Sequence, residues 1–70
     1  MNLRQLRLFE GVRVEALAKR LKVTPSTVLG REAAPIRNLP LGDIIEHAEA
    51  LGLEVQVVVT RPDGSKETLG

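Results

Sequence analysis

The chain of 70 residues contains no cysteine, tryptophan or tyrosine, a single phenylalanine, Phe9, and a single histidine, His47. The absence of cysteine excludes disulfides, thiol chemistry and Cys-ligated zinc. One histidine cannot form a His-cluster metal site, and it leaves little for acid–base catalysis. The near absence of aromatic rings disfavours base stacking on single-stranded nucleic acid and an aromatic ligand cage.

Long apolar runs are also missing. No stretch is long enough to span a membrane, and the start, Met1–Arg4, has no apolar signal-peptide core. We therefore expect a cytoplasmic protein without a membrane partner. The chain also lacks a Gly-rich phosphate loop and a nucleophile with a base beside it. We expect no enzyme, no cofactor and no metal site.

The length allows one small domain with a marginal core. A domain of this size buries only about 60% of the surface that its unfolded chain exposes. Without disulfides or metal, the usual reinforcement is another chain. The size and composition of the chain therefore predict an oligomer or an obligate partner.

Charge is unevenly spread along the chain. Residues 1–37 carry eight Lys or Arg and three Asp or Glu, a net charge of +5, whereas residues 38–70 carry two and six, a net charge of −4. Together they give the +1 of the whole chain. Two ordinary solvated faces would explain this split, and so would a basic half that faces a polyanion.

Apolar periodicity and capping residues predict four helices. Asn2 caps the first helix and Gly11 stops it. Thr24 and Pro25 form the strongest start signal in the chain, because Thr is a good cap and Pro loses no hydrogen bond at the first helical position. The predicted helices are residues 2–10, 14–21, 25–32 and 41–51.

The period changes after Gly52. Residues 53–60 alternate at first and are rich in β-branched side chains, which predicts a strand. Residues 61–64, Arg-Pro-Asp-Gly, predict a turn, and residues 65–69 a shorter returning strand. The expected fold class is mainly α, a helix-turn-helix bundle of about four helices with a C-terminal β-hairpin. We expect two parts, a helix-turn-helix domain over residues 1–52 and a hairpin over residues 53–70 for dimerisation or partner binding.

Residues 14–32 have the spacing of a helix-turn-helix. Ala18 is small where two helices would cross, and Val28 faces back toward Leu17 and Leu21. In such a unit the first helix braces a second helix, whose N-terminus points at the major groove of DNA. That terminus offers free N–H groups and the positive end of the helix dipole to phosphate. The hydroxyl groups of its first turn belong to Thr24, Ser26 and Thr27.

The stretch Val14–Val28, VEALAKRLKVTPSTV, resembles the E-x-L-A-x-x-L-x-V-S-x-S-T-V pattern of the Cro/phage-repressor (Xre-type) helix-turn-helix family. Ala48–Gly52 and the β-rich tail resemble its small antitoxin-like regulators. The resemblance covers roughly the whole chain and implies a sequence-dependent DNA-binding transcriptional regulator that acts as a dimer. It also implies an ion pair between Arg7 in the first helix and Glu32 at the end of the recognition helix. Two solvent-exposed charges are the alternative.

Several family positions hold unusual residues in this chain. The family reads bases from three recognition-helix positions, here Pro25, Ser26 and Gly30, and only Ser26 has a side chain that can bond a base edge. Arg31 stands where the family keeps a buried aliphatic residue, so we expect the helix to be rotated, frayed or shortened there. Arg13 stands where a Ser or Thr cap is typical.

Apolar side chains on and near the recognition helix are also compatible with a second function. Val14, Pro25 and Leu29 would form an apolar surface, which more often meets protein than phosphate. The chain then either binds double-stranded DNA mainly through phosphates and DNA shape, or acts as a protein-interaction adaptor on a degenerate helix-turn-helix scaffold. The DNA-binding candidates are Arg7, Arg13, Lys22, Thr24, Pro25, Ser26, Thr27, Gly30, Arg31 and Arg37.

The predicted first strand needs a partner, because a two-stranded hairpin alone is marginal and an apolar edge invites pairing. It would pack on the fourth helix, add a strand across a homodimer, or capture a toxin-like or other protein. A symmetric dimer would place two recognition helices about one DNA turn, roughly 34 Å, apart. The candidate strand residues are Val55, Val57, Val58 and Val59.

Overall fold

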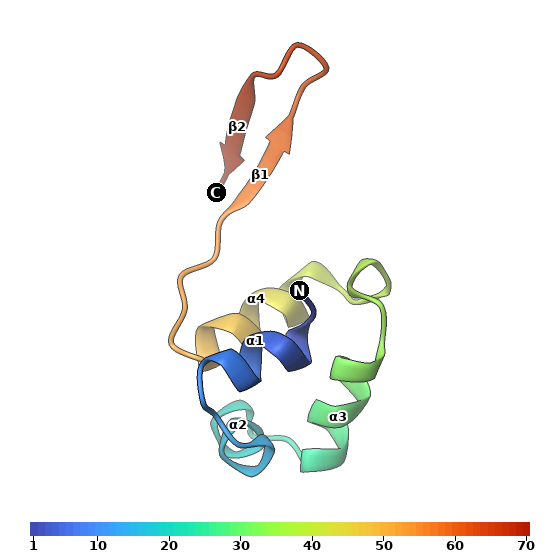
Figure 1. Ribbon diagram of the computed structural model, residues 1–70, viewed down its shortest axis with the longest axis vertical. Coiled ribbons are helices and arrows are strands. Elements are labelled where there is room, and N and C mark those ends of the chain that lie inside the picture. Colours follow the sequence, from blue (N-terminus) through green and yellow to red (C-terminus); the bar gives the residue numbers. More distant parts are fainter.

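The computed structural model describes all 70 residues as a group of helices with a hairpin that extends from it (Figure 1). The elements are α1 (Leu3–Phe9), α2 (Val14–Leu21), α3 (Pro25–Ala33), the 3-10 turn η1 (Ile36–Asn38), α4 (Leu41–Ala50), β1 (Val57–Thr60) and β2 (Lys66–Leu69). This is the predicted fold class. No helix has the length and apolar character that crossing a membrane would require.

The helix ends follow local sequence signals. The Asn2 side chain accepts a hydrogen bond from the Gln5 amide at 2.8 Å, and the Gln5 side chain accepts one from the Asn2 amide at 2.9 Å. This reciprocal capping box satisfies two amides that the first turn leaves free. After α1 the chain reverses through Gly11, which has a φ of +70°. The predicted cap at Asn2 and the stop at Gly11 are therefore confirmed.

The core lies where α2 crosses its neighbours. Leu17 and Val28 are fully buried, and Ala18, Leu21 and Leu51 complete the cluster. α2 packs against both α3 and α4, and α1 packs against α3. Ala18 has only a methyl group, which allows the close approach of helices that the sequence predicted.

The hairpin stands away from the helices, and the molecule measures 43 × 22 × 20 Å (Figure 1). β1 and β2 pair antiparallel, with Val57 opposite Leu69 and Thr60 opposite Lys66. The strands contact each other and make no substantial contact with a helix, so packing of the hairpin on α4, one of the open alternatives, does not occur in the protomer.

The predicted first strand was four residues too long. Residues 53–56 are not in a strand, because β2 is only four residues long and pairs with residues 57–60 alone. Leu53 instead bonds its amide to Ala48 O at 3.1 Å, which turns the chain off the end of α4. Between α3 and α4 the chain also contains η1, a single tight turn.

Candidate nucleic-acid interface

The connection between α2 and α3 is a tight turn, so residues 14–32 are two helices rather than one rod. Lys22 ends α2 in the left-handed conformation, with φ 58° and ψ 41°. The Val23 amide then bonds Ala18 O at 3.0 Å. Val23 is half-buried against the core, which fixes where α3 begins.

The N-terminus of α3 is open to solvent. The Thr24 hydroxyl accepts a hydrogen bond from the Thr27 amide at 3.3 Å, and the two threonine hydroxyls lie 3.0 Å apart. Pro25 has no amide hydrogen, and the Ser26 amide has no acceptor within the chain. Thr24, Pro25, Ser26 and Thr27 are all exposed. The tip therefore presents hydroxyls and a free N–H at the positive end of a helix dipole, which suits an anion.

A buried ion pair holds α3 against α1. Arg7 Nε lies 2.6 Å from Glu32 Oε2, and Arg7 Nη2 donates to Glu32 Oε1 at 3.2 Å. Arg7 Nη1 donates to Val12 O at 3.0 Å, so the same guanidinium also ties down the loop before α2. Both residues are 7% exposed. The hydrogen bond to Glu32 raises the pKa of Arg7 above its ordinary value, against the opposing effect of burial.

The pair corrects one predicted role of Arg7. The sequence placed Arg7 both in the ion pair and among the DNA contacts. Because its side chain is buried and three of its N–H groups are bonded to Glu32 and Val12, Arg7 is not exposed to a phosphate. Arg7 positions the recognition helix instead. The alternative of two solvated charges is likewise wrong.

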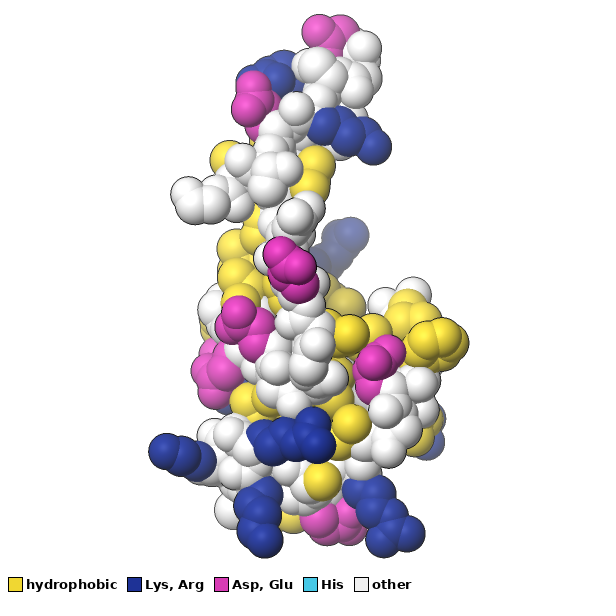
Figure 2. All heavy atoms as spheres, turned by 90° about the vertical axis from the view of Figure 1, so that its left-hand side faces the viewer, with side chains coloured by type: hydrophobic (Ala, Val, Ile, Leu, Met, Phe, Trp, Pro, Cys, Tyr) yellow, Lys and Arg dark blue, Asp and Glu magenta, His cyan; other side chains and the backbone are white.

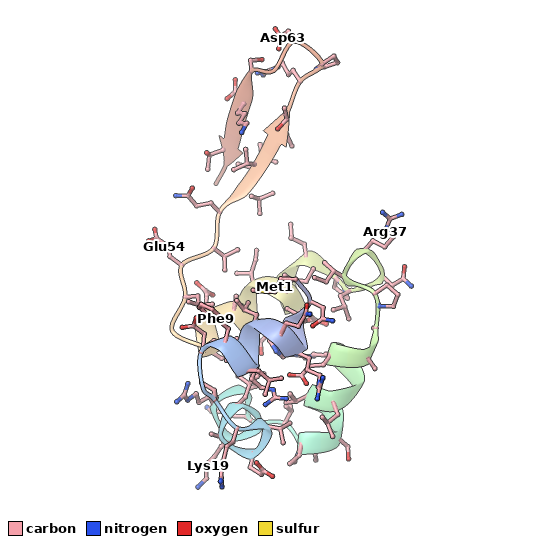
Figure 3. All side chains as sticks on the ribbon, viewed as in Figure 1. Met1, Phe9, Lys19, Arg37, Glu54 and Asp63 are labelled. Carbon is pink, nitrogen blue, oxygen red and sulfur yellow. The ribbon has the colours of Figure 1, made fainter.

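The other predicted basic contacts differ in exposure. Arg13, Lys22 and Arg37 are exposed, and Arg37 projects outward from the loop after α3 (Figure 3). Arg31 is half-buried, and its Nη1 atom is buried without a hydrogen-bond partner. The expected rotation or fraying of α3 at Arg31 is not observed, since the helix continues to Ala33.

Two basic residues near this surface were missed by the sequence prediction. Lys19 points outward at the end of the molecule opposite the hairpin, where Lys and Arg side chains gather (Figures 2 and 3). It lines a hollow of about 450 Å³ between α2 and the start of α3, together with Glu15, Ala16, Ala18, Val23 and Pro25. Arg20 instead donates to Ala50 O at 2.9 Å and anchors the end of α4. The sequence could have indicated that both side chains are exposed, because both residues lie between Leu17 and Leu21 but away from the apolar face of α2.

The exposed face of α3 is short and carries no charged side chain. Ser26, Thr27, Leu29 and Gly30 are exposed, and Leu29 keeps 50% of its surface accessible. Hydroxyl groups are the only side-chain hydrogen-bonding groups that these four positions offer. The face thus lacks the long amide and guanidinium groups that make bidentate contacts to bases.

His47 lies behind this surface, fully buried in α4. Neither ring nitrogen has a hydrogen-bond partner. Burial lowers the pKa of His47 below 6.5, and the charges of Arg31 and Arg7 act in the same direction, whereas Glu32 opposes them. His47 is therefore a neutral residue of the core.

The predicted partner strand lies on the extended hairpin. Val55 and Val57 are half-buried, whereas Val58 and Val59 are exposed to 47% and 43%. Every residue of β2 is exposed. Val57 and Val59 share one face with Leu69 and Glu67, the residues opposite them, because opposed residues of an antiparallel pair point to the same side.

No family model and no curated protein matches the chain. Two solved structures are similar to it. One is a DNA-bound antitoxin HigA3, with a TM-score of 0.91 and 21% identity over 100% of this chain and 90% of that chain. The other is a HigA antitoxin described by induced DNA bending and unique dimerization, with a TM-score of 0.88 and 22% identity over 97% and 90%. At these identities the likeness concerns architecture, and the chain has the fold of these helix-turn-helix antitoxins, hairpin included.

Proposed function

We propose that the chain is a transcriptional regulator of the antitoxin kind that binds double-stranded DNA as a dimer. The open tip of α3 carries this proposal. The Ser26 amide and the hydroxyls of Thr24 and Thr27 lie there at the positive end of the helix dipole. Both similar structures are antitoxins described by DNA binding or DNA bending, which supports the same function for this chain.

Lys22 gives independent support. It is the only residue other than glycine with a positive φ. An L-residue in this conformation costs about 1–2 kcal/mol, and glycine is the residue that usually ends a helix in this way. The fold alone would therefore favour glycine at position 22. A lysine there fits a role for its ammonium group outside the fold, such as binding a phosphate.

The charge distribution favours the same surface. Lys19 and Lys22 are exposed beside the α2–α3 turn, Arg13 is exposed at the start of α2, and Arg37 follows α3, whereas Glu15 is the one carboxylate that lines the hollow with Lys19. The carboxylate of α3 itself, Glu32, is buried and neutralised by Arg7. Because α3 offers few side chains that can hydrogen-bond base edges, most of the affinity would come from phosphate contacts and from DNA shape.

The hairpin supplies the proposed dimer contact. Two strands alone are marginal in water, and these two keep valine side chains exposed with no helix covering them. Pairing with the hairpin of a second copy would cover those side chains and place two α3 helices for successive turns of DNA. A toxin-like protein is the alternative occupant of the same strands.

Salt-dependent binding tests the proposal. The wild-type protein should bind a duplex of the sequence upstream of its own gene, with affinity that falls steeply as salt rises. Lys22→Gly should weaken binding and reduce the slope of log affinity against log salt by about one, because one phosphate is no longer neutralised. The same variant should unfold at an equal or higher temperature, because the left-handed strain is relieved.

Lys66→Ala is the matched control, because it removes the same charge from an exposed residue of β2 that lies opposite Thr60, on the hairpin face away from Val57. It should leave the affinity and the salt slope nearly unchanged. No detectable binding of the wild type at low salt would eliminate the DNA-binding function. A Lys22→Gly variant that binds like the wild type would eliminate the role of Lys22 in binding phosphate.

A protein-interaction adaptor remains the second candidate, favoured by one observation. Leu29 is half exposed on the open face of α3, and an exposed apolar side chain more often meets protein than phosphate. Coexpression with the product of the neighbouring gene tests it. A stoichiometric complex that Leu29→Asp abolishes would support the adaptor, whereas a stable homodimer without that partner would oppose it.

A further inference from the structure

Gly30 lies in the interior of α3, where glycine is the poorest helix former apart from proline. Its φ is not positive, so the backbone does not require glycine. A Cβ atom built at Gly30 would meet nothing within 4 Å, so packing within the protein does not require it either. The protomer gives no reason for glycine at this position.

The position of Gly30 on α3 indicates that the glycine serves contact with a partner. At about 100° per residue, Gly30 points away from the side on which Val28 and Glu32 are buried. Ser26 and Ala33, four residues before and three after, share its exposed face. Around Gly30 the helix backbone can therefore approach a partner more closely than a longer side chain would permit.

The charges around this face identify the kind of partner. The exposed face of α3 carries no carboxylate, because Glu32 is buried against Arg7. Exposed Arg13, Lys22 and Arg37 lie on the segments before and after α3. A small apolar surface bordered by cations suits the major groove, where phosphates flank the base edges. The thymine methyl group is the apolar feature of those edges.

We propose that α3 reads thymine methyl groups through the surface formed by Ser26, Leu29, Gly30 and Ala33, and that Gly30 sets the close approach. The inference rests on the proposed DNA-binding function and names what that surface recognises. Leu29 and Ala33 supply methyl groups for apolar packing against thymine. Gly30 contributes by having no side chain, so that the helix reaches the base edges.

Gly30→Ala should make the protein more stable but weaken its binding to DNA. Alanine is the better helix former, so the melting temperature should rise by roughly 4–8 °C. Affinity for the upstream duplex should fall about tenfold, because the added methyl displaces the helix from the base edges. The salt slope should not change, because no charge is removed.

Gly42→Ala is the matched control. Gly42 is also an exposed helical glycine, in α4, with open space around it. This substitution should also raise the melting temperature and leave DNA affinity unchanged. Equal affinity of Gly30→Ala and wild type would overturn the role of Gly30.

A probe that lacks thymine methyls tests the ligand directly. The same duplex is made with deoxyuridine in place of every thymidine, which keeps the charges and the base-pairing hydrogen bonds. Wild-type affinity should fall by about fourfold for each thymine methyl group that α3 buries. Leu29→Ala should respond less to this exchange than the wild type does. Equal wild-type affinity for both probes would overturn the inference and leave the proposed function intact, whereas no binding to either would remove both.

Discussion

At the scale of single residues, the position of α3 depends on one buried charge pair. Removing one partner of such a pair leaves an uncompensated buried charge, which costs about 3–5 kcal/mol. Arg7→Leu should therefore lower the free energy of unfolding in urea by about that amount. The double variant Arg7→Leu/Glu32→Leu should recover most of the loss, since it removes both charges. A single variant as stable as the wild type would show that the pair does not hold the helix.

The buried His47 predicts a pH dependence of stability. Its pKa in the folded state lies below the unfolded value of about 6.5, mainly because of burial. The unfolded chain therefore binds a proton at a pH where the folded chain does not. The free energy of unfolding should fall as the pH drops from about 7.5 to about 5.5. Glu32 opposes this change, while Arg31 and Arg7 favour it.

His47→Met is the control for this dependence, because methionine adapts to a buried apolar site and does not titrate. The chain has no other histidine, so the variant should show a flat stability profile over the same window. Chemical denaturation at a series of pH values measures both proteins. An equally steep profile in the variant would place the titrating group elsewhere.

At the scale of elements, the start of α3 is specified by its cap. The Thr24 hydroxyl satisfies the Thr27 amide, and alanine at an N-cap costs about 1 kcal/mol. Thr24→Ala should lower the unfolding free energy by about that amount in thermal or urea melts, whereas Thr24→Ser should stay near the wild type. Equal losses in both variants would mean that threonine packing, rather than the hydroxyl, matters at this position.

The elements also show where local signals were sufficient. Asn2, Gly11 and Thr24 act through neighbours within a few residues, so the bounds of the first three helices follow from sequence. The length of β1 does not, because its residues pair with a strand beyond a turn and only four of them find partners. Strand length is a property of the pairing, and β-branched composition alone overestimates it.

At the scale of the whole molecule, an elongated protomer with an uncovered hairpin predicts a dimer. Val57 shares a hairpin face with Val59 and Leu69, whereas Val58 lies on the other face. If the Val57 face is the dimer contact, Val57→Asp should give a monomer and Val58→Asp should remain a dimer. Sedimentation over a range of concentrations measures both. A wild-type protein that is monomeric at all concentrations would contradict the proposed dimer.

The helices, their caps and the turn at Lys22-Val23 could be read from the chain alone, because they depend on periodicity and on short-range hydrogen bonds. The partners of the ion pair, Arg7 and Glu32, are 25 residues apart and were implied only by the resemblance to the Xre-type family. Only the packing of the helices decided which charged side chains are exposed and which are bonded within the protein. Arg7 is withdrawn from solvent by Glu32 and Val12, Lys19 is brought beside Pro25, and Gly30 is placed opposite the buried side of α3. Exposure of a side chain depends on which segments pack over it, and those segments are distant in the chain.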